Sequence, residues 1–173
     1  MTKRIFVSID LPQKTRDYLS SIARPDIYWI KWMKQGNFHI TLNFLGDLTD
    51  AEISEATAVV DNVRVYHKPF TLPLDRLKLE RDMLWVTAAI TPELSALQEE
   101  LQKEFRANRL GKKERRDYQP HVLLAKSKRG RNMEMVIENF VPQQFEVNKI
   151  NLYESELTPG AATHKLIQSF DLG

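Results

Sequence analysis

Phe38-His39-Ile40-Thr41-Leu42-Asn43-Phe44-Leu45-Gly46 is the stretch that decides how this chain folds. Apolar and polar residues alternate along it, which is typical of a β-strand with one face against a core. The alternation predicts an inward face made of the apolar side chains Ile40, Leu42 and Phe44. It predicts an outward face made of the polar side chains His39, Thr41 and Asn43. A polar row of this kind is usually a solvated face of a sheet.

A second stretch, Tyr118-Gln119-Pro120-His121-Val122-Leu123-Leu124-Ala125-Lys126, also reads as a short apolar strand with a histidine near its start. Two strands that each begin with a histidine indicate one site built from two halves of the chain. Lys126 is five residues from His121, so a flat strand would place these two side chains on opposite faces. A shared site therefore requires the second strand to end, twist or bulge between them.

Size and composition limit the class of protein. The chain has 173 residues, of which 42% are hydrophobic, enough to bury a core. It has no cysteine, which excludes disulfides, thiol nucleophiles and thiolate metal sites. The N-terminal residues lack the apolar run of a signal peptide, and no later run reaches membrane-spanning length. We therefore expect a cytoplasmic protein that does not associate with membranes.

Positive charge is concentrated in one segment. The net charge is only +2, yet the segment from Gly111 to Arg131 holds eight basic residues against two acidic ones, and it brackets His121. A run of charge is often only a solvated loop. Beside a histidine strand it also suits an anionic ligand such as a phosphate ester. The basic residues are Lys112, Lys113, Arg115, Arg116, Lys126, Lys128, Arg129 and Arg131.

Local patterns predict strands, helices and turns along the whole chain. Beside the two histidine strands, extended segments are predicted at Lys3–Asp10, Ile27–Met33, Phe70–Leu79, Met83–Ile90, Gln144–Tyr153 and His164–Leu172. Helices are predicted from Pro12 to about Ala23, from the capping box Thr49-x-x-Glu52 to about Val65, and from Thr91-Pro92 toward Gly111. Turns are predicted at Gly46-Asp47, Glu80–Asp82 and Leu157–Gly160, and residues 131–140 are ambiguous between loop and short helix.

This order of elements is an α+β pattern and not a regular βαβ series. Each half of the chain has one long helix and one histidine strand, which indicates a weak internal duplication. No segment is long or polar enough to link independent domains. We expect a single domain over residues 1–173, with two pseudo-symmetric lobes of antiparallel β-sheet, outer helices and a central cleft.

The two histidine strands resemble those of the 2H phosphoesterase superfamily, whose members carry two His-x-Thr/Ser-x motifs. The resemblance is greatest to its RNA 2′,3′-cyclic phosphodiesterase branch, the LigT-like proteins. A third segment, Leu152-Tyr153-Glu154-Ser155-Glu156-Leu157-Thr158-Pro159-Gly160-Ala161, also matches that branch. Together with the N-terminal strand and helix, the similarity spans nearly the whole chain.

The resemblance implies a bilobal fold in which the two motifs face each other across a cleft. It implies hydrolysis of a 2′,3′-cyclic phosphate to a 2′-phosphomonoester without a metal or other cofactor. His39 matches the family's proton donor to the leaving 3′-oxygen, and His121 matches the acceptor that activates water. Thr41 matches the hydroxyl that holds a phosphate oxygen, and Lys126 is a candidate for a further phosphate contact. We expect RNA ends or cyclic nucleotides as partners, and a monomer without an obligate protein partner.

Three positions depart from the family pattern. Leu123 stands where the second motif has Thr or Ser, and a leucine cannot donate a hydrogen bond to phosphate. The protein is then a slower enzyme, a phosphodiesterase for another cyclic phosphoester, or a weakly active or inactive RNA- or phosphate-binding protein. Lys126 replaces an arginine that is frequent in the family, which keeps the charge but loses the bidentate fork. His164 stands where many relatives have tyrosine, with structural and substrate-contacting roles both open.

The remaining histidine and two tryptophans have simpler interpretations. His67, next to Lys68-Pro69, reads as a solvated loop histidine. Trp29 and Trp32 could stack on a nucleobase, although core packing is the commoner role. A metal held by the two motif histidines is the weaker alternative to acid–base chemistry, because neither motif brings a carboxylate at ligand spacing.

Overall fold

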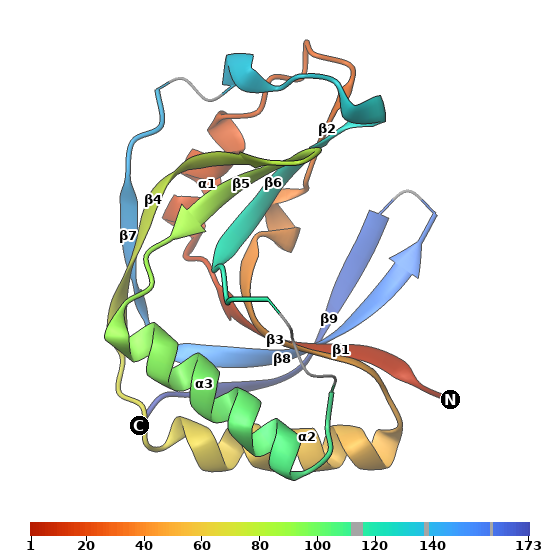
Figure 1. The fold of residues 1–173 in the computed structure, drawn as a ribbon, viewed down its shortest axis with the longest axis vertical. Helices are drawn as coiled ribbons and strands as arrows, with labels where there is room; N and C mark the ends of the chain where they lie inside the picture. Colours follow the sequence, from red (N-terminus) through yellow and green to blue (C-terminus); the bar gives the residue numbers. More distant parts are fainter. Residues whose placement is uncertain (112–115, 137–138, 160) are drawn as a thin grey trace.

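The computed structural model describes residues 1–111, 116–136, 139–159 and 161–173. They form two antiparallel sheets and three α-helices (Figure 1). The first sheet has the strand order β3-β1-β8-β9 and the second has the order β2-β6-β5-β4-β7. The strands are β1 (Lys3–Asp10), β2 (Ile30–Trp32), β3 (His39–Leu48), β4 (Phe70–Glu80), β5 (Met83–Ala88), β6 (His121–Ser127), β7 (Gln143–Val147), β8 (Lys149–Thr158) and β9 (Ala161–Asp171).

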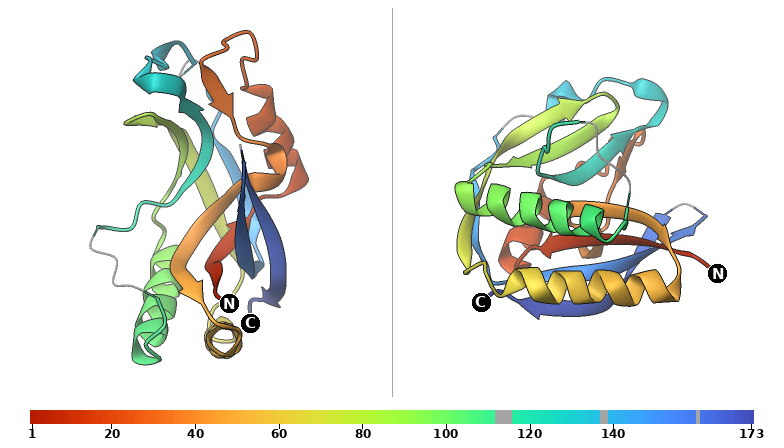
Figure 2. Two further views of the ribbon diagram at one scale, coloured as in Figure 1. Left: turned by 90° about the vertical axis from the view of Figure 1, so that its right-hand side faces the viewer. Right: turned by 60° about the horizontal axis from the view of Figure 1, so that its bottom comes forward.

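The helices begin at the residues that the sequence predicts or close to them. Thr49 forms the predicted capping box with Glu52 at the start of α2 (Asp50–Arg64). Thr91 caps α3 (Pro92–Ala107), with its hydroxyl accepting from the Leu94 N–H at 3.2 Å. Figure 2 shows these two helices side by side beneath the first sheet, while α1 (Gln13–Ser21) lies against the second. The α+β class with two antiparallel sheets and outer helices is therefore confirmed.

The two histidine strands lie in different sheets and share the same local irregularity. In β3 the pairing with β1 skips Leu42, and in β6 the pairing with β5 skips Leu124, so each strand has a bulge three residues after its histidine. The burial pattern of the first seven residues is identical in the two strands. The bulge returns Lys126 to the face of His121, as a shared site requires.

The same bulge makes one prediction for β3 wrong. Asn43 is 8% exposed and Phe44 is 55% exposed, the reverse of the predicted alternation. The predicted turn at Gly46-Asp47 is also wrong, because β3 continues to Leu48. A second shift in the β1–β3 pairing skips Leu45, and Gly46 follows it with a φ of 77°. Glycine adopts this left-handed conformation without the strain that a side chain would add.

The predicted strand over Gln144–Tyr153 is two strands in different sheets. β7 pairs with β4, β8 pairs with β1, and the chain crosses between the sheets at Asn148. Periodicity alone misses this break because the apolar residues continue through it. Buried side chains from both sheets form one continuous cluster.

Short 3₁₀ turns complete the described structure at η1 (Gln35–Asn37), η2 (Lys128–Gly130) and η3 (Glu134–Val136). Residues 112–115 of the basic segment, residues 137–138 of the ambiguous region and Gly160 of the predicted turn lie outside the described residues. Within the described ranges, no helix is both long and apolar enough to cross a membrane.

Candidate active site

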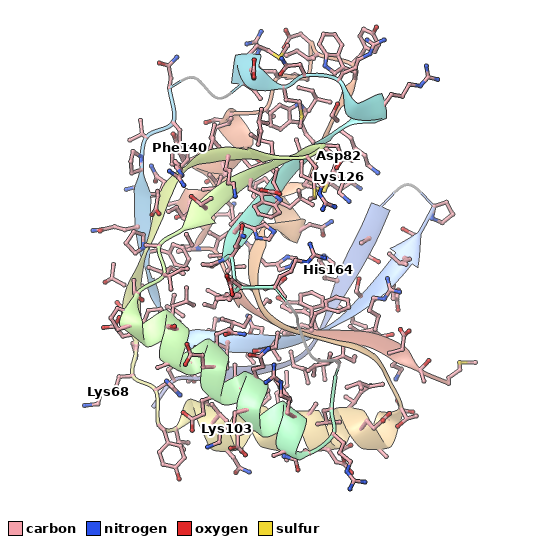
Figure 3. All side chains as sticks on the ribbon, in the orientation of Figure 1. Lys68, Asp82, Lys103, Lys126, Phe140 and His164 are labelled. Atoms are coloured by element: carbon pink, nitrogen blue, oxygen red, sulfur yellow. The ribbon has the colours of Figure 1, made fainter. Side chains whose placement is uncertain are left out.

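A cavity of about 410 Å³ lies where the two sheets meet, and it is lined by residues of both. The first sheet contributes side chains from β3 and β9, and the second contributes side chains from β2 and β6. Figure 3 shows Lys126 of β6 and His164 of β9 facing the same space. The four predicted site residues all line this cavity: His39, Thr41, His121 and Lys126.

The two motif histidines are held by equivalent hydrogen bonds. His39 Nδ1 lies 2.7 Å from the carbonyl oxygen of Asn37, and His121 Nδ1 lies 2.7 Å from the carbonyl oxygen of Gln119. A carbonyl oxygen only accepts, so each Nδ1 must carry a hydrogen and donate it. In the neutral ring Nε2 is then the unprotonated nitrogen. Each histidine therefore keeps Nε2 available to exchange a proton with a ligand.

An aromatic ring from the neighbouring strand supports each histidine. The ring centroids of Trp85 and His121 are 3.7 Å apart with an interplanar angle of 13°, a stacked pair. Those of Phe6 and His39 are 5.0 Å apart and tilted. Trp85 belongs to β5 and lies opposite Leu123 in the β5–β6 register. Sequence reasoning missed Trp85, because its role follows from which strands pair and not from the β5 sequence.

Burial keeps the motif histidines uncharged before an anion enters. Burial lowers the pKa of His39 from 6.5 to about 4, with the Asn37 carbonyl opposing the shift and His164 adding to it. Burial also lowers the pKa of His121, against the raising effect of the Gln119 carbonyl. At neutral pH both rings are therefore neutral imidazoles. A negative charge beside them would raise both pKa values.

His164 is a third imidazole in the cavity wall. Its ring centroid lies 5.1 Å from that of His39, edge to face, and 5.0 Å from that of Phe6. Burial lowers its pKa, and its Nδ1 is buried without a hydrogen-bond partner among the described residues. His164 therefore borders the cavity and contacts a motif histidine, a position that suits both a structural and a substrate-contacting role.

The third residue of each motif lines the cavity, and it is polar in one motif and apolar in the other. Thr41 brings a hydroxyl, and its carbonyl oxygen accepts from the hydroxyl of Tyr118 at 2.9 Å, which ties β3 to the segment before β6. Leu123 brings an apolar side chain to the matching place on β6. The cavity wall therefore has a hydroxyl on the β3 side and none at the matching place on the β6 side.

Other candidates from the sequence lie in different surroundings. Trp32 lines the cavity, and its Nε1 donates to the Arg24 carbonyl at 3.2 Å. The solvated-loop interpretation of His67 is wrong: its side chain is 12% exposed and its Nε2 lies 2.7 Å from a Glu100 carboxylate oxygen. No group of three or more His, Cys, Asp or Glu that could hold a metal ion occurs among the described residues.

We expect His39 in the free protein to titrate near pH 4, well below its ordinary pKa of 6.5. Inorganic phosphate should raise that pKa, because the anion favours the charged ring. Long-range ¹H–¹⁵N spectra of the imidazole nitrogens, recorded against pH, measure both the pKa and the tautomer, and a His39→Gln variant assigns the signals. A midpoint at or above pH 6.5, or a hydrogen on Nε2 of the neutral ring, would contradict the geometry described above.

Comparisons with known proteins agree with this architecture. A family model described as the 2′-5′ RNA ligase superfamily matches residues 31–159. RNA 2′,3′-cyclic phosphodiesterases of Methanothermobacter thermautotrophicus and Thermotoga maritima are 26% and 27% identical, covering 99% and 95% of this chain and 100% and 92% of their own. The crystal structure of E. coli LigT complexed with 3′-AMP superposes with a TM-score of 0.79 at 20% identity, covering 99% of each chain. The predicted resemblance is confirmed, and the chain belongs to the 2′-5′ RNA ligase superfamily.

Proposed function

We propose that this protein hydrolyses 2′,3′-cyclic phosphates of RNA or nucleotides to 2′-phosphomonoesters. The observation that carries the proposal is the pair of imidazoles from two different sheets, anchored alike through Nδ1 and bordering one cavity. Displacement at phosphorus needs a base for the attacking water and an acid for the leaving oxygen, and two histidines can divide these roles. The names of the relatives, RNA 2′,3′-cyclic phosphodiesterase, support the same reaction.

In this reaction His121 Nε2 takes a proton from a water molecule as the water oxygen bonds to phosphorus. The bond between phosphorus and the 3′-oxygen breaks, and His39 Nε2 gives its proton to that oxygen. The product carries a free 3′-hydroxyl and a 2′-phosphate. Exchange with solvent then returns the proton from His121 and restores the one on His39. No metal takes part in these steps.

Because the pKa of His39 is low, the bound substrate must help to protonate the histidine that acts as the acid. A neutral His39 cannot donate a proton from Nε2, since the only hydrogen of the ring is on Nδ1. The cyclic phosphate carries a negative charge, which favours protonation of the imidazole beside it. The acid is therefore formed when the anion binds, and water alone in the cavity leaves it uncharged.

Thr41 and Lys126 are the residues that bind the phosphate in this proposal. The Thr41 hydroxyl lies on the His39 side of the cavity and can donate to a phosphate oxygen. Lys126 lies on the His121 side and offers positive charge. Side chains from both sheets can therefore stabilise the negative charge that develops on the phosphate oxygens during displacement.

A second function is favoured by one observation, the apolar side chain of Leu123 on the cavity wall. Loss of one donor to a developing oxyanion costs about 10²–10³ in rate in other enzymes. With that cost, the protein would be a weakly active or inactive RNA- or phosphate-binding protein, or it would act on another cyclic phosphoester. The retention of both anchored histidines favours the enzyme, because binding alone requires neither free Nε2.

Replacing either motif histidine should abolish most of the activity. We expect His39→Ala and His121→Ala each to lower kcat by about 10²–10⁴-fold, since each removes one proton transfer. The measurement is hydrolysis of a nucleoside 2′,3′-cyclic phosphate in EDTA, with ³¹P NMR to show that only the 2′-phosphate forms. His67→Ala removes a histidine outside the cavity and should leave kcat unchanged. Unchanged turnover by His121→Ala, or loss of turnover in EDTA, would exclude the proposed mechanism.

Restoring a hydroxyl to the second motif should raise the rate. Leu123→Thr adds a donor beside His121, and we expect kcat to rise, by at most about 10²–10³-fold. Leu123→Val, which has nearly the same shape as threonine but no hydroxyl, is the matched control and should not gain activity. If the native protein is inert and Leu123→Thr turns over, the binding function is the correct one for the native chain.

A further inference from the structure

One end of the cavity carries more positive charge than a cyclic phosphate neutralises. Lys31 of β2 and Lys126 of β6 are cross-strand partners, and both line the cavity together with Lys34. A 2′,3′-cyclic phosphate has a single negative charge. Lys34 and Lys126 alone carry two positive charges at the cavity, which indicates that a substrate brings further negative charge to this place.

The positive surface continues beyond the cavity along the paired ends of β2 and β6. The pairing extends to Ile30 and Ser127, after which the Lys128 N–H donates to the Trp29 carbonyl at 2.7 Å. The Lys128 Nζ donates to the Tyr28 carbonyl at 3.0 Å. Lys128 directly follows β6, which ends at Ser127, and it begins the η2 turn. The cations thus form a row that leads away from the cavity.

Aromatic rings hold a further cation at the end of this row. The Arg131 guanidinium lies 5.7 Å from the ring centre of Tyr28 and 5.5 Å from that of Trp29. Its Nη1 donates to the Tyr28 hydroxyl at 3.1 Å, and the Ser127 hydroxyl donates to the Arg131 carbonyl at 2.6 Å. The Tyr28 side chain is 70% exposed. An ordered cation beside an exposed aromatic ring is typical of surfaces that bind single-stranded nucleic acid.

Carboxylates near this row do not cancel its charge. Asp82, labelled beside Lys126 in Figure 3, lies in the turn between β4 and β5, and its carbonyl accepts from the Ser127 N–H at 2.7 Å. Glu134 follows in η3 and bonds to Asn132. Five basic residues outnumber these two carboxylates, and we call them the basic edge: Lys34, Lys126, Lys128, Arg129 and Arg131.

We propose that the basic edge binds the nucleotides on the 5′ side of the cyclic phosphate when the substrate is an RNA chain. This inference rests on the proposed function and adds to it a binding surface outside the cavity. The terminal cyclic phosphate occupies the cavity, and the preceding phosphates follow the row from Lys126 to Arg131. Tyr28 offers its exposed ring to a base of the same segment. A free cyclic nucleotide reaches the cavity but not the outer part of the edge.

The test compares two substrates that end in the same nucleoside 2′,3′-cyclic phosphate, one a mononucleotide and one an eight-nucleotide RNA. We expect kcat/KM for the RNA to exceed that for the mononucleotide by at least about 20-fold at 50 mM salt. Three phosphate contacts outside the cavity would make this advantage fall roughly 20-fold between 50 and 200 mM salt. Equal kcat/KM for the two substrates would overturn the inference and leave the proposed function intact.

Variants test whether the higher kcat/KM for the RNA depends on the basic edge. Lys128→Ala/Arg131→Ala removes two outer cations, so the ratio of the two kcat/KM values should fall and its logarithmic salt slope should flatten by about 1.4. The matched control is Lys68→Ala/Lys103→Ala, which removes two exposed lysines from the opposite end of the molecule, beside the helices (Figure 3). It should leave the ratio unchanged. The same ratio in both double variants would overturn the inference.

A binding measurement separates this inference from the proposed function. Should neither substrate be hydrolysed, the proposed function fails, and fluorescence anisotropy with a labelled eight-nucleotide RNA ending in a 2′-phosphate still tests the basic edge. Weaker, less salt-dependent binding by Lys128→Ala/Arg131→Ala than by the control supports the edge. Equal binding by the two double variants rejects it.

Discussion

The hydrogen bond from each motif histidine to the carbonyl two residues before it is the interaction on which the site depends. It fixes the tautomer, leaves Nε2 available to a ligand and holds the ring against a neighbouring aromatic side chain. Asn37 ends the η1 turn, and Gln119 precedes Pro120, so both carbonyls lie just outside their strands. The same bond, formed once in each sheet, places two equivalent imidazoles on one cavity.

The backbones of β3 and β6 also match beyond the histidines, because each strand has a bulge at the same place. In both strands the bulge brings the fifth residue after the histidine back to the exposed face, which is Phe44 in one strand and Lys126 in the other. Equivalent places therefore carry different chemistry. One half has a hydroxyl at Thr41, and the other has a cation at Lys126 and an apolar side chain at Leu123. An asymmetric reaction, with a base on one side of phosphorus and an acid on the other, fits such a site.

Much of this arrangement could be predicted from the sequence, because local rules determine it. The capping residues Thr49 and Thr91, the hairpin turn at Glu80–Asp82 and the two histidine strands all depend on nearby residues, and these predictions are confirmed. Residue spacing also showed that β6 must end, twist or bulge for Lys126 to join His121, and the structure shows a bulge. The bulge in β3 was not foreseen, since its own residues alternate regularly and the shift is visible only in the pairing with β1.

Contacts between distant segments could not be predicted in the same way. Trp85 meets His121 because β5 pairs with β6, and His164 meets His39 because β9 turns back along β8. His67 is half-buried against Glu100 of α3, a contact that its loop sequence does not indicate. The low pKa of His39 likewise arises from the whole of its surroundings, since burial is its largest cause.

The pH dependence of kcat/KM for a nucleoside 2′,3′-cyclic phosphate, measured in EDTA, tests the paired-histidine mechanism most directly. The reactive complex has His39 protonated and His121 neutral, and in the free protein burial lowers both pKa values from 6.5. The profile reports the pair and should be bell-shaped. Its alkaline limb should begin below pH 6.5, so that kcat/KM falls as pH rises through neutrality. A rate that stays constant from pH 6.5 to about pH 8 would contradict a mechanism in which these two histidines exchange protons with the substrate.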